Sequence, residues 1–253
     1  MTSLGFSPNT RSVVIVGDYG SGKTEIAVNL AIHLAQQLDD RSIAIADLDL
    51  VNPYFRCREA VDLLELSGVR VVAPEGGHRF ADLPILLPQV KGLLQSDNQM
   101  SILDVGGDEV GSRVLAGLAP VFDPERHELW FVVNTNRPFN DTVDGCIGAV
   151  RRIELASGLR VSGLISNTHL MRETTLDMVR IGLDVSERVA YALGVPVRLV
   201  AAMASLDGLS DSSIGSSSYF VLRMRRLMVP PWLRREVIPK GRGGSDIFRL
   251  RSS

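Results

Sequence analysis

The sequence has few of the residues that build disulfide frameworks and metal centres. It contains only two cysteines, Cys57 and Cys146, and these form no C-x-x-C pair. Its four histidines are scattered without the spacing that metal ligands require. We therefore expect a protein of a reducing compartment, without a disulfide framework or a histidine-based metal site.

Long apolar runs are also missing. No apolar stretch is long enough to span a bilayer, and no signal-peptide core opens the chain. The apolar fraction of 45% and the charged fraction of 22% are ordinary for a globular protein. A chain of 253 residues can form one large α/β domain or at most two small ones. We expect a cytoplasmic protein.

Short apolar runs alternate with helical patterns along the chain. The runs are continuous and mostly aliphatic, as in strands that helices cover on both faces, and they occupy residues 13–16, 43–46, 101–103, 129–133, 161–165 and 197–201. The helical patterns occupy residues 24–38, 57–67, 83–95, 112–119, 141–157 and 173–193. This alternation predicts a doubly wound, mostly parallel α/β sheet flanked by helices, with its ligand at the carboxyl ends of the strands.

The most informative segment is residues 17–24, Gly-Asp-Tyr-Gly-Ser-Gly-Lys-Thr, which matches G-x-x-x-x-G-K-[ST] at every fixed position. It follows a predicted strand and opens a predicted helix, where glycines and backbone N–H groups can cradle phosphate. Lys23 would reach the β- and γ-phosphates, and the Thr24 hydroxyl would hold Mg²⁺. The predicted nucleotide-binding residues are Gly17, Gly20, Ser21, Gly22, Lys23 and Thr24.

Acidic residues follow two of the predicted strands. Asp47 and Asp49 stand at i and i+2, so both carboxylates point to one side of the chain. Asp104 ends a later strand and is followed by Gly106 and Gly107, as in the D-x-x-G switch of nucleotide hydrolases. An aspartate at such a strand end orients Mg²⁺ in P-loop proteins. These segments are candidate switch loops that sense the γ-phosphate.

Together these motifs resemble the P-loop ATPases of the nitrogenase iron protein, MinD/ParA and CobQ group, within the SIMIBI class, over roughly residues 11–205. The resemblance implies that Asp49 positions the hydrolytic water and that Asp104 supports Mg²⁺. The expected catalytic residues are then Lys23, Asp49 and Asp104, and the expected metal-site residues are Thr24, Asp49 and Asp104. It also places Asn167 beside adenine, and since no N-K-x-D follows, ATP is favoured over GTP.

The sequence departs from this group at two places. MinD/ParA proteins carry a lysine just after the first P-loop glycine that reaches the partner's nucleotide, and here that residue is Asp18. A homodimer sandwiching ATP is thus an open alternative, and Asp18 could instead bind an arginine, with Arg56 and Arg113 as candidates. The paired cysteines of the iron protein are missing as a pattern, so we expect no iron–sulfur cluster.

Charge is unevenly distributed. Residues 221–253 carry nine basic and two acidic residues, a net charge of +7, which leaves −9 for residues 1–220. We therefore divide the chain into a P-loop nucleotide-binding domain over residues 1–210 and a basic C-terminal extension over residues 211–253. Such an imbalance predicts a partner surface or an intramolecular latch.

Three segments leave alternatives open. Residues 219–228 predict a basic, loosely amphipathic helix; the stretch 219–235 could lie on an anionic membrane, dock on a partner or pack on its own acidic domain. Nucleic-acid binding is disfavoured because only the tail is basic. Arg137, in segment 134–139, could meet the nucleotide or a bound partner, or belong to a plain turn capped near Asn140 or Asp141. Residues 74–79 could form a lid over a substrate or partner.

Three classes of function fit these features. The preferred one is an Mg·ATP-driven switch whose loops control a protein partner. The alternative is an ATP-dependent synthetase or kinase of the dethiobiotin synthetase and CobQ type, which needs a cationic acceptor pocket near the γ-phosphate. A nucleotide-binding scaffold without turnover is the third.

Overall fold

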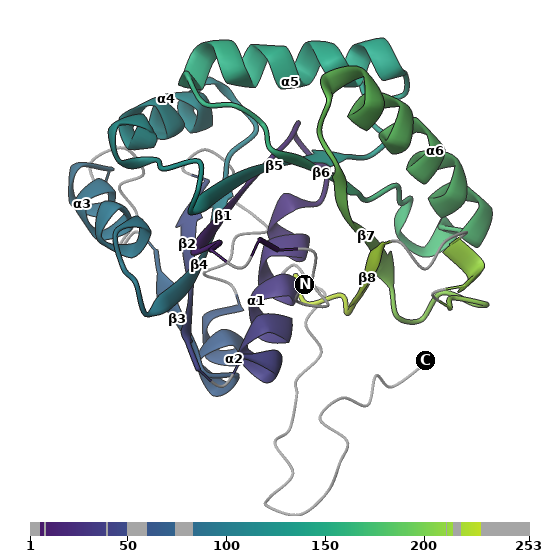
Figure 1. Ribbon diagram of the computed structural model, residues 1–253. Helices are drawn as coiled ribbons and strands as arrows, with labels where there is room; N and C mark the ends of the chain where they lie inside the picture. Colours follow the sequence, from purple (N-terminus) through teal and green to yellow (C-terminus); the bar gives the residue numbers. More distant parts are fainter. Residues whose placement is uncertain are drawn as a thin grey trace, which may run out of the picture.

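A single parallel sheet forms the centre of the protein. The computed structural model describes residues 6–7, 9–38, 40–49, 60–73, 83–210, 212–214 and 219–228. The sheet has eight strands in the order β3-β2-β4-β1-β5-β6-β7-β8, and every neighbouring pair is parallel (Figure 1). The strands are β1 (Ser12–Val16), β2 (Ser42–Leu48), β3 (Val69–Val72), β4 (Gln99–Val105), β5 (His127–Val133), β6 (Gly163–Ser166), β7 (Val197–Met203) and β8 (Phe220–Met224). This is the predicted doubly wound α/β architecture of a P-loop NTPase.

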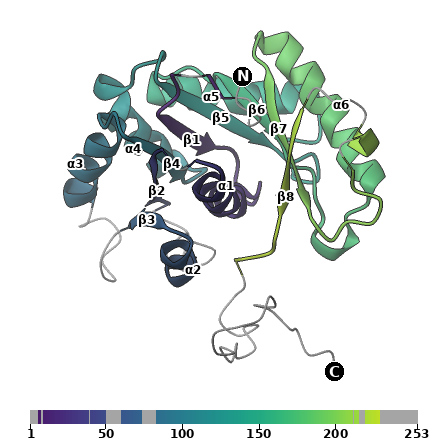
Figure 2. The ribbon, with the colours of Figure 1, turned by 60° about the horizontal axis from the view of Figure 1, so that its bottom comes forward.

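Helices cover both faces of the sheet. They are α1 (Lys23–Gln37), α2 (Val61–Leu66), α3 (Leu83–Leu94), α4 (Glu109–Leu118), α5 (Val143–Ser157) and α6 (Leu176–Leu193). Helices α1 and α2 pack on one face, and α3, α4, α5 and α6 pack on the other (Figures 1 and 2). Within the described residues, no helix has the length and apolarity needed to cross a membrane.

The alternation of strand residues builds two cores. In β1, Val13 and Ile15 pack toward α1, whereas Val14 and Val16 pack toward the other helices, and all four are buried. Side chains of successive strand residues point to opposite faces, so a sheet covered on both sides needs an uninterrupted apolar run. This explains why the predicted strands show continuous apolar runs.

The predicted helix over residues 219–228 is wrong. Residues 220–224 form β8, which pairs with β7 at the edge of the sheet. Leu222 and Met224 are buried against α1, whereas Arg223 between them is exposed. That alternation has the period of a strand, and the edge left open by β7 supplied the hydrogen bonds. The described part of this segment therefore packs on its own domain.

Other elements differ from prediction at their ends. Helix α2 lies within the predicted helix over residues 57–67 but is shorter, and residues 57–59 lie outside the described part. Strand β3, which follows it, was not predicted. Helix α4 begins three residues early because Asp108 caps it through the Gly111 N–H at 2.9 Å. Helix α5 is capped by Thr142 rather than by Asn140 or Asp141.

Candidate functional site

The loop between β1 and α1 has the backbone of an anion cradle. Gly17, Gly20 and Gly22 all have positive φ values, of 152°, 72° and 95°. A Cβ atom at Gly22 would collide with the Asn167 side chain, so the loop needs glycine there for both reasons. Gly22 is the N-cap residue of α1 and supplies no side-chain cap, which leaves the first N–H groups of the helix available to a ligand.

Lys23 lies over this loop with its side chain buried. Its Nζ donates a hydrogen bond to the Asp18 carbonyl oxygen at 3.0 Å. Burial lowers the pKa of Lys23, and the carboxylates of Asp104 and Asp49 oppose that shift. A bound phosphate would replace the carbonyl as the partner of the ammonium group and would favour its charged form.

Three buried carboxylates meet at the ends of β2 and β4. Asp47 and Asp104 are direct neighbours in the parallel ladder, and Asp49 follows two residues after Asp47. Burial raises the pKa of Asp104 to about 7, and the charge of Asp47 adds to the rise. The Thr24 hydroxyl donates to Asp104 Oδ2 at 2.6 Å, which partly offsets it. The predicted metal-site residues are therefore close together.

This group of oxygen atoms fits Mg²⁺. Hydroxyl and carboxylate oxygens are the ligands that Mg²⁺ prefers, and in nucleotide sites phosphates and waters complete its shell. Within the described residues, no group of three or more His, Cys, Asp or Glu side chains is arranged to hold a metal alone. Thr24 and Asp104 would hold Mg²⁺ together with the nucleotide, and the ion would neutralise charge on the phosphates.

The glycines after Asp104 lie directly on the P-loop. A Cβ atom at Gly107 would collide with the Gly17 carbonyl oxygen and would lie 3.0 Å from Lys23 Nζ. A Cβ atom at Gly106 would lie 3.3 Å from Asp49 Oδ1. The segment predicted as a switch is thus in contact with the phosphate-binding loop and with the carboxylate cluster.

Asn167 is placed against the P-loop as well. It is buried at the end of β6, and its Nδ2 donates to the Ser21 carbonyl oxygen at 2.8 Å. Its Oδ1 has no hydrogen-bond partner among the described residues. The structure therefore shows a contact that holds the loop, which sequence reasoning missed, while the contact with adenine stays a prediction.

Asp18 turns toward a different arginine than predicted. Asp18 Oδ1 lies 3.9 Å from Arg152 on α5. Arg113 instead pairs with Glu109 on its own helix, at 2.6 Å. Arg56 lies outside the described residues. Arg152 was missed because α5 is more than a hundred residues away in the chain.

Arg137 contacts the same loop from the end of β5. Its Nε donates to the Gly20 carbonyl oxygen at 2.7 Å. The structure shows the turn and also places Arg137 on the P-loop, while a contact with the nucleotide or a bound partner stays a prediction. The sequence shows that Arg137 follows a core strand, which suggested a role at the ligand edge of the sheet. It does not show which loop Arg137 contacts.

Cys146 packs in the core beside α4 and β5. Burial raises the pKa of its thiol to about 12, and Sγ donates to the Asn140 carbonyl oxygen at 3.4 Å. Cys57, the lid candidate at 74–79, the switch residues 50–56 and the tail from residue 229 lie outside the described residues.

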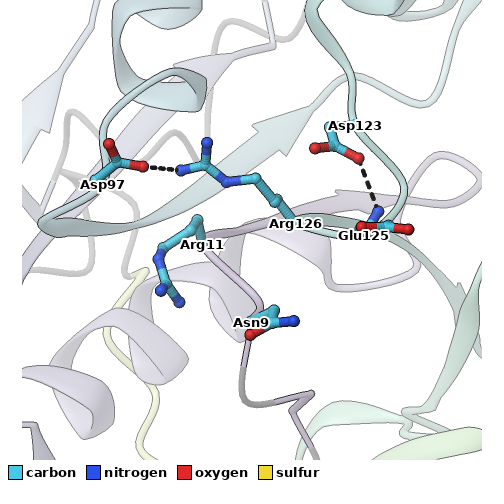
Figure 3. Close-up of a pocket in the computed structure, with 6 residues that line it drawn as sticks. All are labelled: Asn9, Arg11, Asp97, Asp123, Glu125 and Arg126. Atoms are coloured by element: carbon cyan, nitrogen blue, oxygen red, sulfur yellow. Dashed lines mark hydrogen bonds and ion pairs between the residues drawn. The ribbon is translucent and has the colours of Figure 1, made fainter.

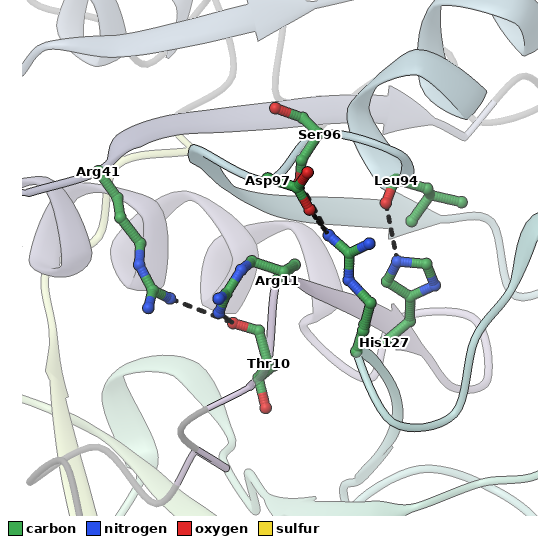
Figure 4. Close-up of polar contacts among 8 residues, drawn as sticks. Thr10, Arg11, Arg41, Leu94, Ser96, Asp97 and His127 are labelled. Atoms are coloured by element: carbon green, nitrogen blue, oxygen red, sulfur yellow. Dashed lines mark hydrogen bonds and ion pairs between the residues drawn. The ribbon is translucent and has the colours of Figure 1, made fainter.

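A hollow of about 270 Å³ lies at the opposite, amino edge of the sheet. Its lining is polar and mixed in charge: Asn9, Arg11, Asp97, Asp123, Glu125 and Arg126 (Figure 3). Arg126 bonds Asp97, and the guanidinium groups of Arg11 and Arg41 both donate to the Thr10 carbonyl oxygen, while His127 Nε2 bonds the Leu94 carbonyl oxygen (Figure 4). These hydrogen bonds stabilise the amino ends of the central strands, at the edge of the sheet opposite to the P-loop.

The fold resembles that of solved signal recognition particle and FtsY proteins. No protein-family model matches the chain, and no curated protein sequence matches it significantly. The signal recognition particle 54 kDa protein of Aeropyrum pernix in complex with GDP superposes with a TM-score of 0.53 and 19% identity, over 79% of this chain and 43% of that one. FtsY of Elizabethkingia anophelis in complex with GDP gives 0.54 and 17%, over 83% and 66%.

FtsY of Thermotoga maritima gives a TM-score of 0.50 and 20% identity, over 79% of this chain and 64% of that one. The chain thus spans between about two fifths and two thirds of the length of these proteins. At this identity the likeness establishes the fold alone. It does not single out the nitrogenase iron protein, MinD/ParA and CobQ group.

Proposed function

We propose that this protein binds Mg·ATP at residues 17–24 and hydrolyses it as a molecular switch that controls a protein partner. The observation that carries the proposal is the close approach of Gly107 to the P-loop, where an added Cβ atom would collide with the Gly17 carbonyl oxygen and lie 3.0 Å from Lys23 Nζ. A triphosphate entering the loop must rearrange these groups, because its terminal phosphate needs the ammonium of Lys23. Nucleotide binding is thereby linked to the position of the loop after β4.

The other residues have distinct roles in this proposal. Lys23 leaves the Asp18 carbonyl for the phosphates, while Thr24 and Asp104 hold Mg²⁺. Asp49, whose N–H donates to Asp47 Oδ1 at 3.2 Å, orients the attacking water. The hollow of Figure 3 lies at the amino edge of the sheet, so it is not placed to serve as the acceptor pocket that a synthetase or kinase needs.

Adenine rather than guanine is supported by residue type. Guanine presents two N–H donors on one edge, which a carboxylate reads in guanine-specific P-loop proteins, and residues 167–170 are Asn-Thr-His-Leu. The free Oδ1 of Asn167 is an acceptor suited to the adenine amino group. The GDP bound in two of the compared structures makes guanine the alternative.

The partner is proposed to be a protein that reads the loops around the nucleotide, and a second copy of this chain is the first one to test. The basic residues 229–253 would supply an electrostatic contact to an acidic partner. An anionic membrane surface is the alternative for the tail, and salt should weaken either contact.

Calorimetry with Mg·ATP tests the nucleotide site. The unmodified protein should bind, and Lys23→Ala should lose most of its triphosphate affinity while keeping its circular dichroism spectrum. Lys91→Ala on α3 is the matched control, because it removes the same charge away from the loop. Equal ATP affinity in the Lys23→Ala and unmodified proteins would reject the site.

A further inference from the structure

Arg137 lies flat against the P-loop. Beyond the 2.7 Å hydrogen bond from Nε to the Gly20 carbonyl oxygen, a Cβ atom at Gly20 would lie 3.2 Å from the guanidinium carbon. The side chain is half-buried. The guanidinium therefore packs against the P-loop at Gly20.

The segment that carries Arg137 is well fixed. The Asn140 N–H donates to the Arg137 carbonyl oxygen at 3.1 Å, closing a turn. Phe139, within that turn, has a φ of 69°, a conformation uncommon outside glycine. The Phe139 carbonyl packs so closely on α5 that a Cβ atom at Gly145 would collide with it. Such a backbone places Arg137 on the loop reproducibly and holds it there.

Within the described part of the chain, Arg137 has no ion-pair partner. Among the described residues, no carboxylate lies within ion-pair distance of it, whereas Asp18 on the same loop faces Arg152 at 3.9 Å. A guanidinium has five N–H donors, and the contact with Gly20 uses the one on Nε. With respect to the described residues, both Nη groups therefore remain to bind an anion at the P-loop.

We propose that Arg137 binds the phosphate chain of the nucleotide through its Nη groups while its Nε holds the Gly20 carbonyl. This rests on the proposed function and adds a cation to the site, where Asp18 stands in place of the lysine of related ATPases. Guanidinium and phosphate form charge-assisted, often bidentate hydrogen bonds, and a planar fork anchored at Nε is oriented for them in advance.

The test separates charge from loop support. Arg137→Gln removes the charge but keeps an N–H donor for the Gly20 carbonyl, and Arg137→Lys keeps the charge but loses the fork. Arg152→Gln is the matched control, because it removes an exposed arginine that faces the same loop. Affinity is measured by calorimetry and competition for ATP, ADP and adenosine, with melting temperatures to confirm folding.

Arg137→Gln should weaken ATP and ADP binding by about 10-fold or more, the range for a hydrogen bond to a charged group, and leave adenosine binding unchanged. Arg137→Lys should retain part of the affinity, and Arg152→Gln should match the unmodified protein. Unchanged ATP affinity in Arg137→Gln, or an equal loss for adenosine, would overturn the assignment while the Lys23→Ala result still upheld the nucleotide site. No binding by the unmodified protein would overturn both.

Discussion

The Thr24 hydroxyl donates a 2.6 Å hydrogen bond to Asp104 Oδ2 and so joins the start of α1 to the end of β4 across 80 residues of sequence. In a Mg²⁺ site, the same hydroxyl oxygen and carboxylate would face the ion. The two groups are therefore already within reach of one cation before nucleotide arrives. The bond also stabilises an aspartate that burial and the neighbouring Asp47 disfavour in its charged form.

Asp104→Asn should stabilise the nucleotide-free protein at pH 8. The pKa of Asp104 is about 7 in the fold, against an ordinary value of 3.8, so the folded state binds a proton that the unfolded state releases between these values. The stability that protonated Asp104 contributes to the fold is fully present below pH 3.8. It falls as the pH rises from 3.8 toward 7, and it is lost above pH 7. Because asparagine does not ionise, the Asp104→Asn variant avoids this loss, and its unfolding free energy at pH 8 should be higher by roughly 2–4 kcal/mol.

Urea titrations in a chelating buffer at pH 5 and pH 8 measure this effect. The gain of the asparagine variant over the unmodified protein should be larger at pH 8 than at pH 5. A gain that is the same at both pH values would show that Asp104 does not titrate in this range.

Asp49→Asn should slow ATP turnover without removing ATP binding. If Asp49 orients the water, its loss should reduce the single-turnover rate by roughly 10²-fold, the scale of a positioned general base. Mg·ATP affinity should change little, because Lys23 and Thr24 carry the phosphate contacts. A single-turnover rate near that of the unmodified protein would reject the role of Asp49.

Gly107→Ala should disturb the resting arrangement of the switch. The added Cβ would collide with the Gly17 carbonyl oxygen, a backbone atom that cannot rotate away. We expect a lower melting temperature without nucleotide and altered ATP affinity. Gly148→Ala on α5 is the control, because its Cβ would meet only Arg152 Nη1 at 3.6 Å, and there alanine should stabilise the helix by up to about 1 kcal/mol.

Asn167→Ala should weaken nucleotide binding and reduce the preference for adenine. It leaves the Ser21 carbonyl without its 2.8 Å partner and removes the proposed acceptor for the adenine amino group. Competition between ATP and GTP measures the preference in both proteins. If GTP competes equally well against the unmodified protein, the adenine assignment is wrong, and Asn167 serves only the loop.

Asn29→Ala should destabilise the segment that follows β8. Asn29 binds the backbone of Arg225 twice, donating to its carbonyl oxygen at 2.9 Å and accepting from its N–H at 2.8 Å. Leaving both groups unpaired should cost about 2 kcal/mol of unfolding free energy. Deleting residues 229–253 should spare this contact, so the melting temperature of that truncation should stay near that of the full chain.

Asn136→Ala, at an exposed position, is the control for Asn29→Ala and should leave stability unchanged.

Sedimentation with lipid vesicles tests whether the tail, residues 229–253, binds a membrane. Binding of the full chain to anionic vesicles that the truncation lacks would support the membrane alternative. Absence of vesicle binding would leave an acidic protein partner as the proposed ligand of the tail.

The sequence by itself determined the features that depend on short stretches of chain. Residues 17–24 needed only their own spacing and flanking patterns to predict a phosphate loop, and the continuous apolar runs predicted a sheet covered on both faces. Asp104 could be placed near Thr24 because parallel strands bring their carboxyl ends to the same edge.

The tertiary structure decided the rest. Strand β8 exists because β7 offers an open edge, and the contacts of Asn167 and Arg137 with the P-loop join residues more than a hundred positions apart. A local pattern carries no information about such partners. Their hydrogen bonds form only after the strands have been ordered and the loops at their ends have been brought together, so no spacing in the sequence predicts them.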